Sequence, residues 1–184
     1  MNTSPSKRTL LLEAASHIIL TAGVERLTLE AVAREAGVSK GGLLYHFPSK
    51  EALVIGLIEQ VLDHFDLASQ HEFDHDPTPD APGRWLRAYV RATLADEGVS
   101  NPLSAGLLAA VATNPALLAP LRERFAQWQE RTEHDGLDPA HATIIRLAVD
   151  GLWLTELCGF APLATALRAQ IHERLLALAQ ENPG

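Results

Sequence analysis

Apolar residues recur at steps of three and four along most of the chain, which is the period of an amphipathic helix. The stripe of Leu11, Ala14, Ala15, Ile18 and Ala22 is one example. The sequence has no sustained alternation of apolar and polar residues and no Asn-Gly hairpin signal. The pattern predicts an all-α protein of about nine helices. They are expected at residues 5–22, 29–36, 40–46, 50–72, 81–97, 102–112, 120–134, 139–159 and 163–181.

Residues that cap helix N-termini stand before several of these segments. They are Thr28, Ser39, Ser49, Asn101, Asn114 and Asp138. Proline follows each of the last three at the first helical position, where its missing N–H leaves no hydrogen bond unmade. Pro120 leaves residues 115–119 open between a separate short turn and a kinked helix start. The segment 71–83, rich in Asp, His and Pro, is expected to be a surface loop.

Residues 27–50, LTLEAVAREAGVSKGGLLYHFPSK, combine two short helix patterns with a glycine turn between them. Ala33 is small enough for a second helix to cross closely, and Gly37 can adopt the positive φ that the turn requires. Leu43 is suited to anchor the second helix to the core. This spacing is typical of a helix-turn-helix, whose second helix enters the major groove of DNA.

Basic and hydrogen-bonding residues gather where the second helix begins. Lys40 and Lys50 each follow a capping serine, where a cation opposes the helix dipole by about 0.3–1 kcal/mol. Phosphate contacts would explain both positions, and the alternative is that both lysines are merely exposed and screened. The adjacent residues Gly41 and Gly42 weaken the same helix by about 1 kcal/mol each. Their presence favours a helix backbone that approaches DNA closely over simple fraying of the helix start. The expected DNA contacts are Thr28, Ser39, Lys40, Gly41, Gly42, Leu43, Tyr45, His46 and Lys50. For His46 the alternative is a half-buried side chain that caps its own helix.

Charge is distributed unevenly along the chain. Residues 1–50 carry six Lys and Arg against four Glu, a net charge of +2, whereas the whole chain carries −8. The remaining 134 residues therefore sum to −10. Only the N-terminal quarter suits a polyanion, and the acidic remainder would be repelled by DNA and so help to orient the molecule.

Two motifs in this quarter resemble the TetR family of bacterial transcriptional regulators. They are Gly37-Val38-Ser39-Lys40-Gly41 and the run Tyr45-His46-Phe47-Pro48-Ser49-Lys50, and the resemblance extends over residues 5–60. It implies a DNA-binding domain, taken as residues 1–49, and an effector-binding and dimerisation domain, taken as residues 50–184 with a connecting helix at 50–72. It also implies a homodimer in which a small-molecule effector spreads the two heads and releases a palindromic operator, as a repressor does. Many members have tyrosine just after the anchor residue. This chain has Leu44 there, so that phosphate contact is expected to be lost or to move to Tyr45.

The last two predicted helices favour a dimer interface. Residues 144–160 are apolar almost all round, and a helix of that kind must be covered on every side. The final helix repeats leucine and isoleucine at three- and four-residue steps, which suits an isologous four-helix contact. Closing the monomer core is the alternative. The expected interface residues are Ile145, Val149, Leu152, Leu163, Leu167, Ile171 and Leu175.

The helices between residues 55 and 160 are expected to enclose an effector pocket. Its candidates are the aromatic and apolar residues of that region, with one histidine as a polar anchor: His64, Phe65, Trp85, Tyr89, Leu107, Phe125, Trp128 and Trp153. Each of these residues is also suited to an ordinary helical core. Because few charges lie among the apolar positions, the effector is expected to be mostly apolar or aromatic.

Other functions are less well supported by the sequence. A metal-responsive regulator would use the His/Asp-rich segment 64–76, where His71 and His75 are four residues apart, but Pro77 and Pro79 indicate that the helix ends there. A helical interaction scaffold without DNA binding is a further alternative. No catalytic motif is present, so no enzyme activity, cofactor or metal is expected. Cys158 is the only cysteine and is expected to be a small buried apolar residue. Apolar runs are too short to span a membrane and no signal peptide is recognisable, so the expected compartment is the cytoplasm.

Overall fold

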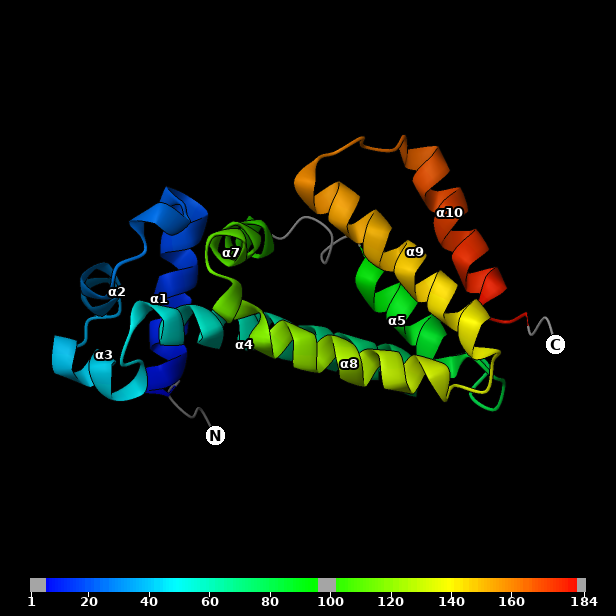
Figure 1. The fold of residues 1–184 in the computed structure, drawn as a ribbon, viewed down its shortest axis with the longest axis horizontal. Coiled ribbons are helices and arrows are strands. Elements are labelled where there is room, and N and C mark those ends of the chain that lie inside the picture. The colour runs from blue at the N-terminus through cyan, green and yellow to red at the C-terminus, as the bar shows by residue number, and fades with distance from the viewer. Residues whose placement is uncertain (1–5, 96–101, 182–184) are drawn as a thin grey trace. The chain divides into compact units, whose positions relative to one another are not determined.

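The structure, a computed structural model, describes residues 6–95 and 102–181. Within those ranges it contains nine α-helices and two 3-10 helices and no strand, which confirms the predicted all-α class (Figure 1). In chain order they are α1 (Lys7–Ala22), η1 (Val24–Arg26), α2 (Leu29–Glu35), α3 (Lys40–His46), α4 (Lys50–Asp74), α5 (Arg84–Leu94), α7 (Pro102–Thr113), η2 (Pro115–Leu118), α8 (Ala119–Glu133), α9 (Pro139–Cys158) and α10 (Thr165–Leu178).

Most helix ends lie within two or three residues of the predicted ones, because the capping residues act as expected. Asn114 starts the separate turn η2 and Asp138 caps α9, where its carboxylate accepts a hydrogen bond from the His141 N–H at 2.8 Å. This turn covers residues 115–118 and runs directly into α8 at Ala119. Predicted helix positions 5, 96 and 97 and the cap Asn101 lie outside the described residues.

The segment 71–83 differs from the predicted surface loop. Helix α4 continues to Asp74, and Asp76 is buried rather than solvated. Helix α5 begins only at Arg84, because the preceding Gly83 has a φ of 80°, which is not helical. Glycine is required at this position, since a Cβ there would lie 2.2 Å from the Ala179 carbonyl oxygen. Its first N–H groups are capped from a distance, since the Asp135 carboxylate accepts from the Trp85 N–H at 2.9 Å.

The chain divides into two compact units. Unit 1 runs to Val61 and includes Pro102–Leu121, and unit 2 takes up the chain from Leu62 and again from Arg122. The division falls within α4. The reason is that the first turns of α4 pack on the head, where a Cβ on Gly56 would lie 2.8 Å from the Phe47 ring.

Unit 1 has a small core made by α1, α2, α3 and the start of α4. Leu11, Leu43 and Leu57 are fully buried in it, and each comes from a different helix. Helix α7 also packs against α1, with Gly106 so close to Ile19 that a Cβ would lie 2.6 Å from its Cγ2. The three short apolar faces of α1, α2 and α3 are thus stabilised by packing on one another.

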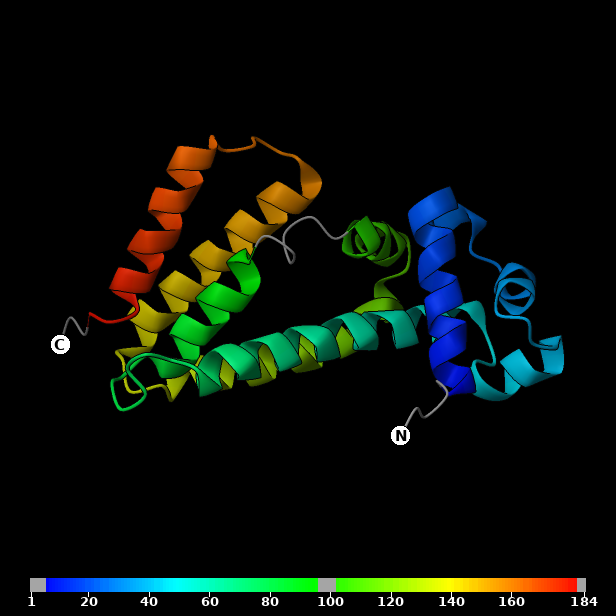
Figure 2. The ribbon, with the colours of Figure 1, turned by 180° about the vertical axis from the view of Figure 1, so that it is seen from behind.

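Unit 2 is built around α5, which is buried along most of its length. Helices α9 and α10 pack against it and against each other, as both ribbon views show (Figures 1 and 2). The second half of α4 is linked to α8, where the Trp128 indole N–H donates to the Asp66 carboxylate at 2.8 Å. None of the helices in the described ranges combines the length and the apolar character needed to cross a membrane.

Candidate nucleic-acid interface

Helices α2 and α3 are joined by a tight turn with the geometry that the sequence predicts. Gly37 has a φ of 65°, a conformation that side chains with a Cβ rarely adopt. The Val38 N–H donates to the Ala33 carbonyl at 2.9 Å, which closes the C-terminus of α2. Ala33 and Leu43 are both buried. The turn and its anchor therefore hold α3 rigidly against α2.

The predicted caps form at the start of α2, α3 and α4. The side-chain oxygens of Thr28, Ser39 and Ser49 each accept a backbone N–H from three residues further on at 3.1 Å. A hydroxyl that accepts in this way still has its own O–H to donate. Thr28 and Ser39 are exposed, so their hydroxyl protons are available to an acceptor outside the protein.

The outer face of α3 lies opposite its buried anchor. Gly41 and Tyr45 are four residues apart and share this face, and the Tyr45 side chain is 85% exposed. A Cβ on Gly41 would meet no atom within 4 Å, whereas one on Gly42 would lie 3.3 Å from the Ser39 Oγ. Packing inside the protomer therefore gives no reason for glycine at position 41.

The remaining candidates lie at the two ends of α3 and at the start of α4. Lys40 is exposed and its Nζ lies 2.7 Å from the Oε1 of Glu30, on α2. Lys50 is also exposed, and His46 is half-buried with its ring edge-on to Tyr45 at 5.1 Å. The fully buried side chain of Leu43 serves as the anchor and is not available for contact.

Five of the predicted pocket residues come together in unit 2. Ring contacts link Phe65 to Tyr89 at 5.2 Å and to Trp128 at 4.6 Å, Phe125 to Trp128 at 4.9 Å, and Trp85 to Tyr89 at 6.1 Å. Each distance joins two ring centroids, and offset or edge-on pairs of this kind are favourable. We call these five residues the aromatic cluster.

The other predicted pocket residues lie elsewhere. Leu107 belongs to α7 in unit 1, His64 is exposed, and Trp153 is half-buried on α9. A periodic pattern shows which side of a helix is apolar and leaves open which neighbour that side meets, so it could not separate these three residues from the cluster.

A polar network beside the aromatic cluster was not predicted. The Tyr89 hydroxyl donates to Asp150 at 2.5 Å, and Arg146 bridges Asp150 at 2.6 Å and the Gln129 side chain at 2.8 Å. Burial raises the pKa of Asp150 above its ordinary value, although the bonds from Tyr89 and Arg146 act in the opposite direction. The signal in the sequence was the i, i+4 pair of opposite charges within an otherwise apolar helix.

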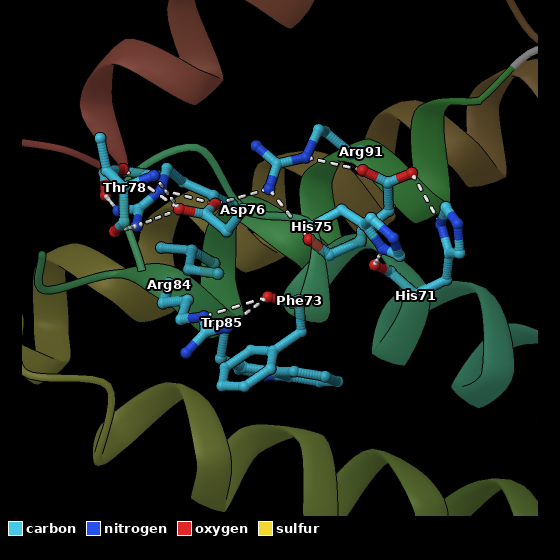
Figure 3. Close-up of polar contacts among 12 residues, drawn as sticks. His71, Phe73, His75, Asp76, Thr78, Arg84, Trp85 and Arg91 are labelled. Carbon is cyan, nitrogen blue, oxygen red and sulfur yellow. Dashed lines mark hydrogen bonds and ion pairs between the residues drawn. The ribbon is translucent and has the colours of Figure 1, made fainter. Parts of the chain in front are cut away.

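In the segment considered as a metal site, several polar side chains form hydrogen bonds or ion pairs with other protein groups. Figure 3 shows the His75 Nδ1 directed at the His71 carbonyl, at 2.8 Å, while the two imidazole rings stack with centroids 4.3 Å apart. Asp76 and Glu72 are both bound by Arg91, at 2.6 and 2.8 Å. Among the residues that the structure describes, no group of three or more His, Cys, Asp or Glu is placed to hold a metal ion.

An apolar stripe remains exposed on α9. Ile144, Leu147, Gly151 and Leu154 follow at three- and four-residue steps, and the first two are 66% and 54% exposed. A Cβ on Gly151 would meet no atom within 4 Å. A large apolar side chain in water is unfavourable, and a whole stripe of them is typical of a contact surface.

The structure buries some of the residues predicted for the dimer interface and exposes others. Ile145, Val149 and Leu175 are buried in the core of their own unit, so they are not available to a partner. Leu152, Leu163 and Ile171 are half-buried, and Leu167 is exposed. The prediction selected the inner side of α9 because the sequence is apolar on both sides of this helix.

Together, a helix-turn-helix head and a helical C-terminal unit are features of a class of DNA-binding transcriptional regulators. Two family models match: "Bacterial regulatory proteins, tetR family" over residues 11–57, and "Tetracyclin repressor-like, C-terminal domain" over residues 83–180. The chain belongs to the TetR family of transcriptional regulators, which are not enzymes.

Individual relatives are consistent with that assignment. RutR from Escherichia coli K12 is 40% identical over 89 residues, which is 48% of this chain and only 40% of RutR. BetI from Pectobacterium carotovorum is 28% identical over 162 residues, 82% of each chain. Among solved structures, a TetR-family member from Streptomyces coelicolor A3 has a TM-score of 0.66 at 27% identity and covers 93% of this chain and 98% of its own. The multidrug binding protein EbrR, complexed with imidazole, has a TM-score of 0.64 at 25% identity and covers 94% and 96%.

Proposed function

We propose that this protein is a homodimeric repressor that binds a palindromic operator through α3 and is released by a small, mostly apolar effector. The observation that carries the proposal is the outer face of α3. It presents a glycine that the protomer does not require and an exposed tyrosine, and the helix begins with an exposed capping serine and an exposed lysine.

The proposed contacts divide into two kinds. Lys40, Lys50, Thr28 and Ser39 are suited to phosphates, which fix the position of the head on the duplex without reading sequence. Tyr45 and the backbone at Gly41 face outward from the centre of α3 and are suited to base edges or thymine methyl groups in the major groove. His46 is assigned a phosphate contact at the C-terminal end of the helix.

The exposed stripe of α9 supports the dimer. Two copies of the stripe facing each other across a two-fold axis would bury Ile144, Leu147 and Leu154 of each protomer, and Gly151 would let the two helices approach closely. Exposed Leu167 on α10 extends the same proposed surface. A two-fold dimer suits a palindrome because its heads meet successive major grooves about 34 Å apart.

The aromatic cluster supports the effector site. Its rings are suited to a flat or apolar molecule, and the Tyr89–Asp150 pair offers one polar point beside them. EbrR, similar over nearly the whole chain, was solved with a small aromatic molecule bound, which favours the same kind of ligand here. Binding of the effector would change the spacing of the two heads and so release the operator.

Selection of bound duplexes from a random pool tests the proposal without knowledge of the operator. We expect enrichment of sequences with two inverted half-sites whose centres are about 10 base pairs apart. The same selection with Tyr45→Ala should lose the sequence preference while weak binding to all duplexes remains. Failure of the wild-type protein to enrich any sequence would contradict the proposal.

A further inference from the structure

The ion pair between Glu30 and Lys40 joins the two helices of the reading head. The Lys40 Nζ lies 2.7 Å from the Glu30 Oε1, and both side chains are largely exposed. The lysine stands in the first turn of α3, where its charge opposes the helix dipole, and the glutamate stands in the first turn of α2, where its charge is favourable. The carboxylate therefore offsets, in the free protein, the unfavourable position of the lysine.

The same lysine is the group that the proposed function assigns to a DNA phosphate. A carboxylate and a phosphate oxygen are both anionic acceptors, and each attracts the same ammonium group. The Lys40 contact of the head therefore has an acceptor within the protein before DNA arrives. An exposed ion pair of this kind is weak enough for a duplex to displace.

We propose that Glu30 is an internal competitor for the phosphate contact of Lys40 and that it lowers the affinity of the head for DNA. The inference rests on the proposed function, because it requires Lys40 to contact a phosphate. On binding, the ammonium leaves the Glu30 carboxylate for the duplex. The carboxylate is then left next to a polyanion and takes up a cation from solution.

This exchange has a consequence for the salt dependence of binding. A lysine that neutralises a phosphate normally releases a counterion, and the logarithm of the affinity falls by about 0.9 per contact with the logarithm of salt concentration. Uptake of a cation by Glu30 cancels that release. The Lys40 contact therefore contributes little to the salt slope of the wild-type protein. Once the Glu30 carboxylate is removed, the contact contributes its full value of about 0.9 to the slope.

The test compares duplex binding by wild type, Glu30→Gln, Lys40→Ala and the double variant, by fluorescence anisotropy at several salt concentrations. Glu30→Gln is expected to tighten binding of the dimer by roughly 2- to 30-fold, the range set by two exposed ion pairs. It should also steepen the salt slope by about 1.8. Both gains should vanish in the Lys40→Ala background.

A matched control separates the pair from the general effect of removing a negative charge. Glu25 is exposed on η1 of the same unit, and Glu25→Gln should leave the salt slope unchanged. Weaker or unaltered binding by Glu30→Gln, or a gain that persists without Lys40 or is matched by Glu25→Gln, would overturn the inference. If Lys40→Ala leaves affinity unchanged in the Glu30→Gln background as well, the assigned phosphate contact of the proposed function fails, which distinguishes the two failures.

Discussion

Replacing Gly41 should change stability and DNA affinity in opposite directions. The residue lies in α3 without a positive φ, and a Cβ there would meet no protein atom within 4 Å. Gly41→Ala removes backbone freedom from the unfolded chain without strain in the fold, which is worth about 0.5–1 kcal/mol. For a chain of this length that corresponds to a rise of about 1–4 °C in the melting temperature, measured at fixed protein concentration.

The same methyl group should obstruct the duplex. Overpacking a close contact costs about 1–3 kcal/mol, so each head would lose about 5- to 150-fold in affinity, and Gly41→Leu should lose more. Gly37→Ala is the control, because its φ of 65° makes the substitution destabilising. A Gly41→Leu variant that melts at or above the wild-type temperature and still binds the selected duplex with full affinity would refute the reasoning.

Three further predictions concern the C-terminal unit. Asp76→Asn leaves the fully buried Arg87 without its carboxylate and should lower the free energy of unfolding by about 3–5 kcal/mol in urea titrations, against less than about 1 kcal/mol for Glu59→Gln at an exposed pair. Burial alone would raise the pKa of Asp76, but bonds from Arg87, Arg91 and the Thr78 N–H hold it well below its ordinary value of 3.8. The pair therefore stabilises the fold above about pH 4, and wild type should lose this part of its stability as the pH falls further, whereas Asp76→Asn should not. Leu147→Glu should shift the protein towards monomer in sedimentation experiments while Leu67→Glu, at a similarly exposed leucine, leaves its mass unchanged.

The helices and the reading head could be predicted because their determinants are local. Capping by Thr28 and Ser39, the glycine turn at Gly37 and the anchor Leu43 are each decided within a few residues, and all are present in the structure. The Asp138–Pro139 pair likewise predicted the start of α9, which Asp138 caps. In these cases residues close together in the sequence decide the local structure.

The interior of the C-terminal unit could not be predicted in the same way. Asp76 was assigned to a solvated loop, yet it lies buried against Arg87, which also donates to the Ala179 carbonyl 92 residues further along the chain. Asp135 caps α5 from 50 residues away. A sequence pattern does not encode such distant pairings, and for the same reason it did not show which face of α9 is exposed.

The most direct test of the central claim is the salt dependence of duplex binding, measured for wild type and Lys50→Ala. If the two heads of a dimer place lysines on phosphates, the double-logarithmic slope should be negative, about −0.9 for each phosphate that a lysine neutralises, and Lys50→Ala should flatten it by about 1.8 while weakening binding to every duplex. A wild-type affinity that does not change with salt, or a Lys50→Ala variant indistinguishable from wild type, would contradict the account.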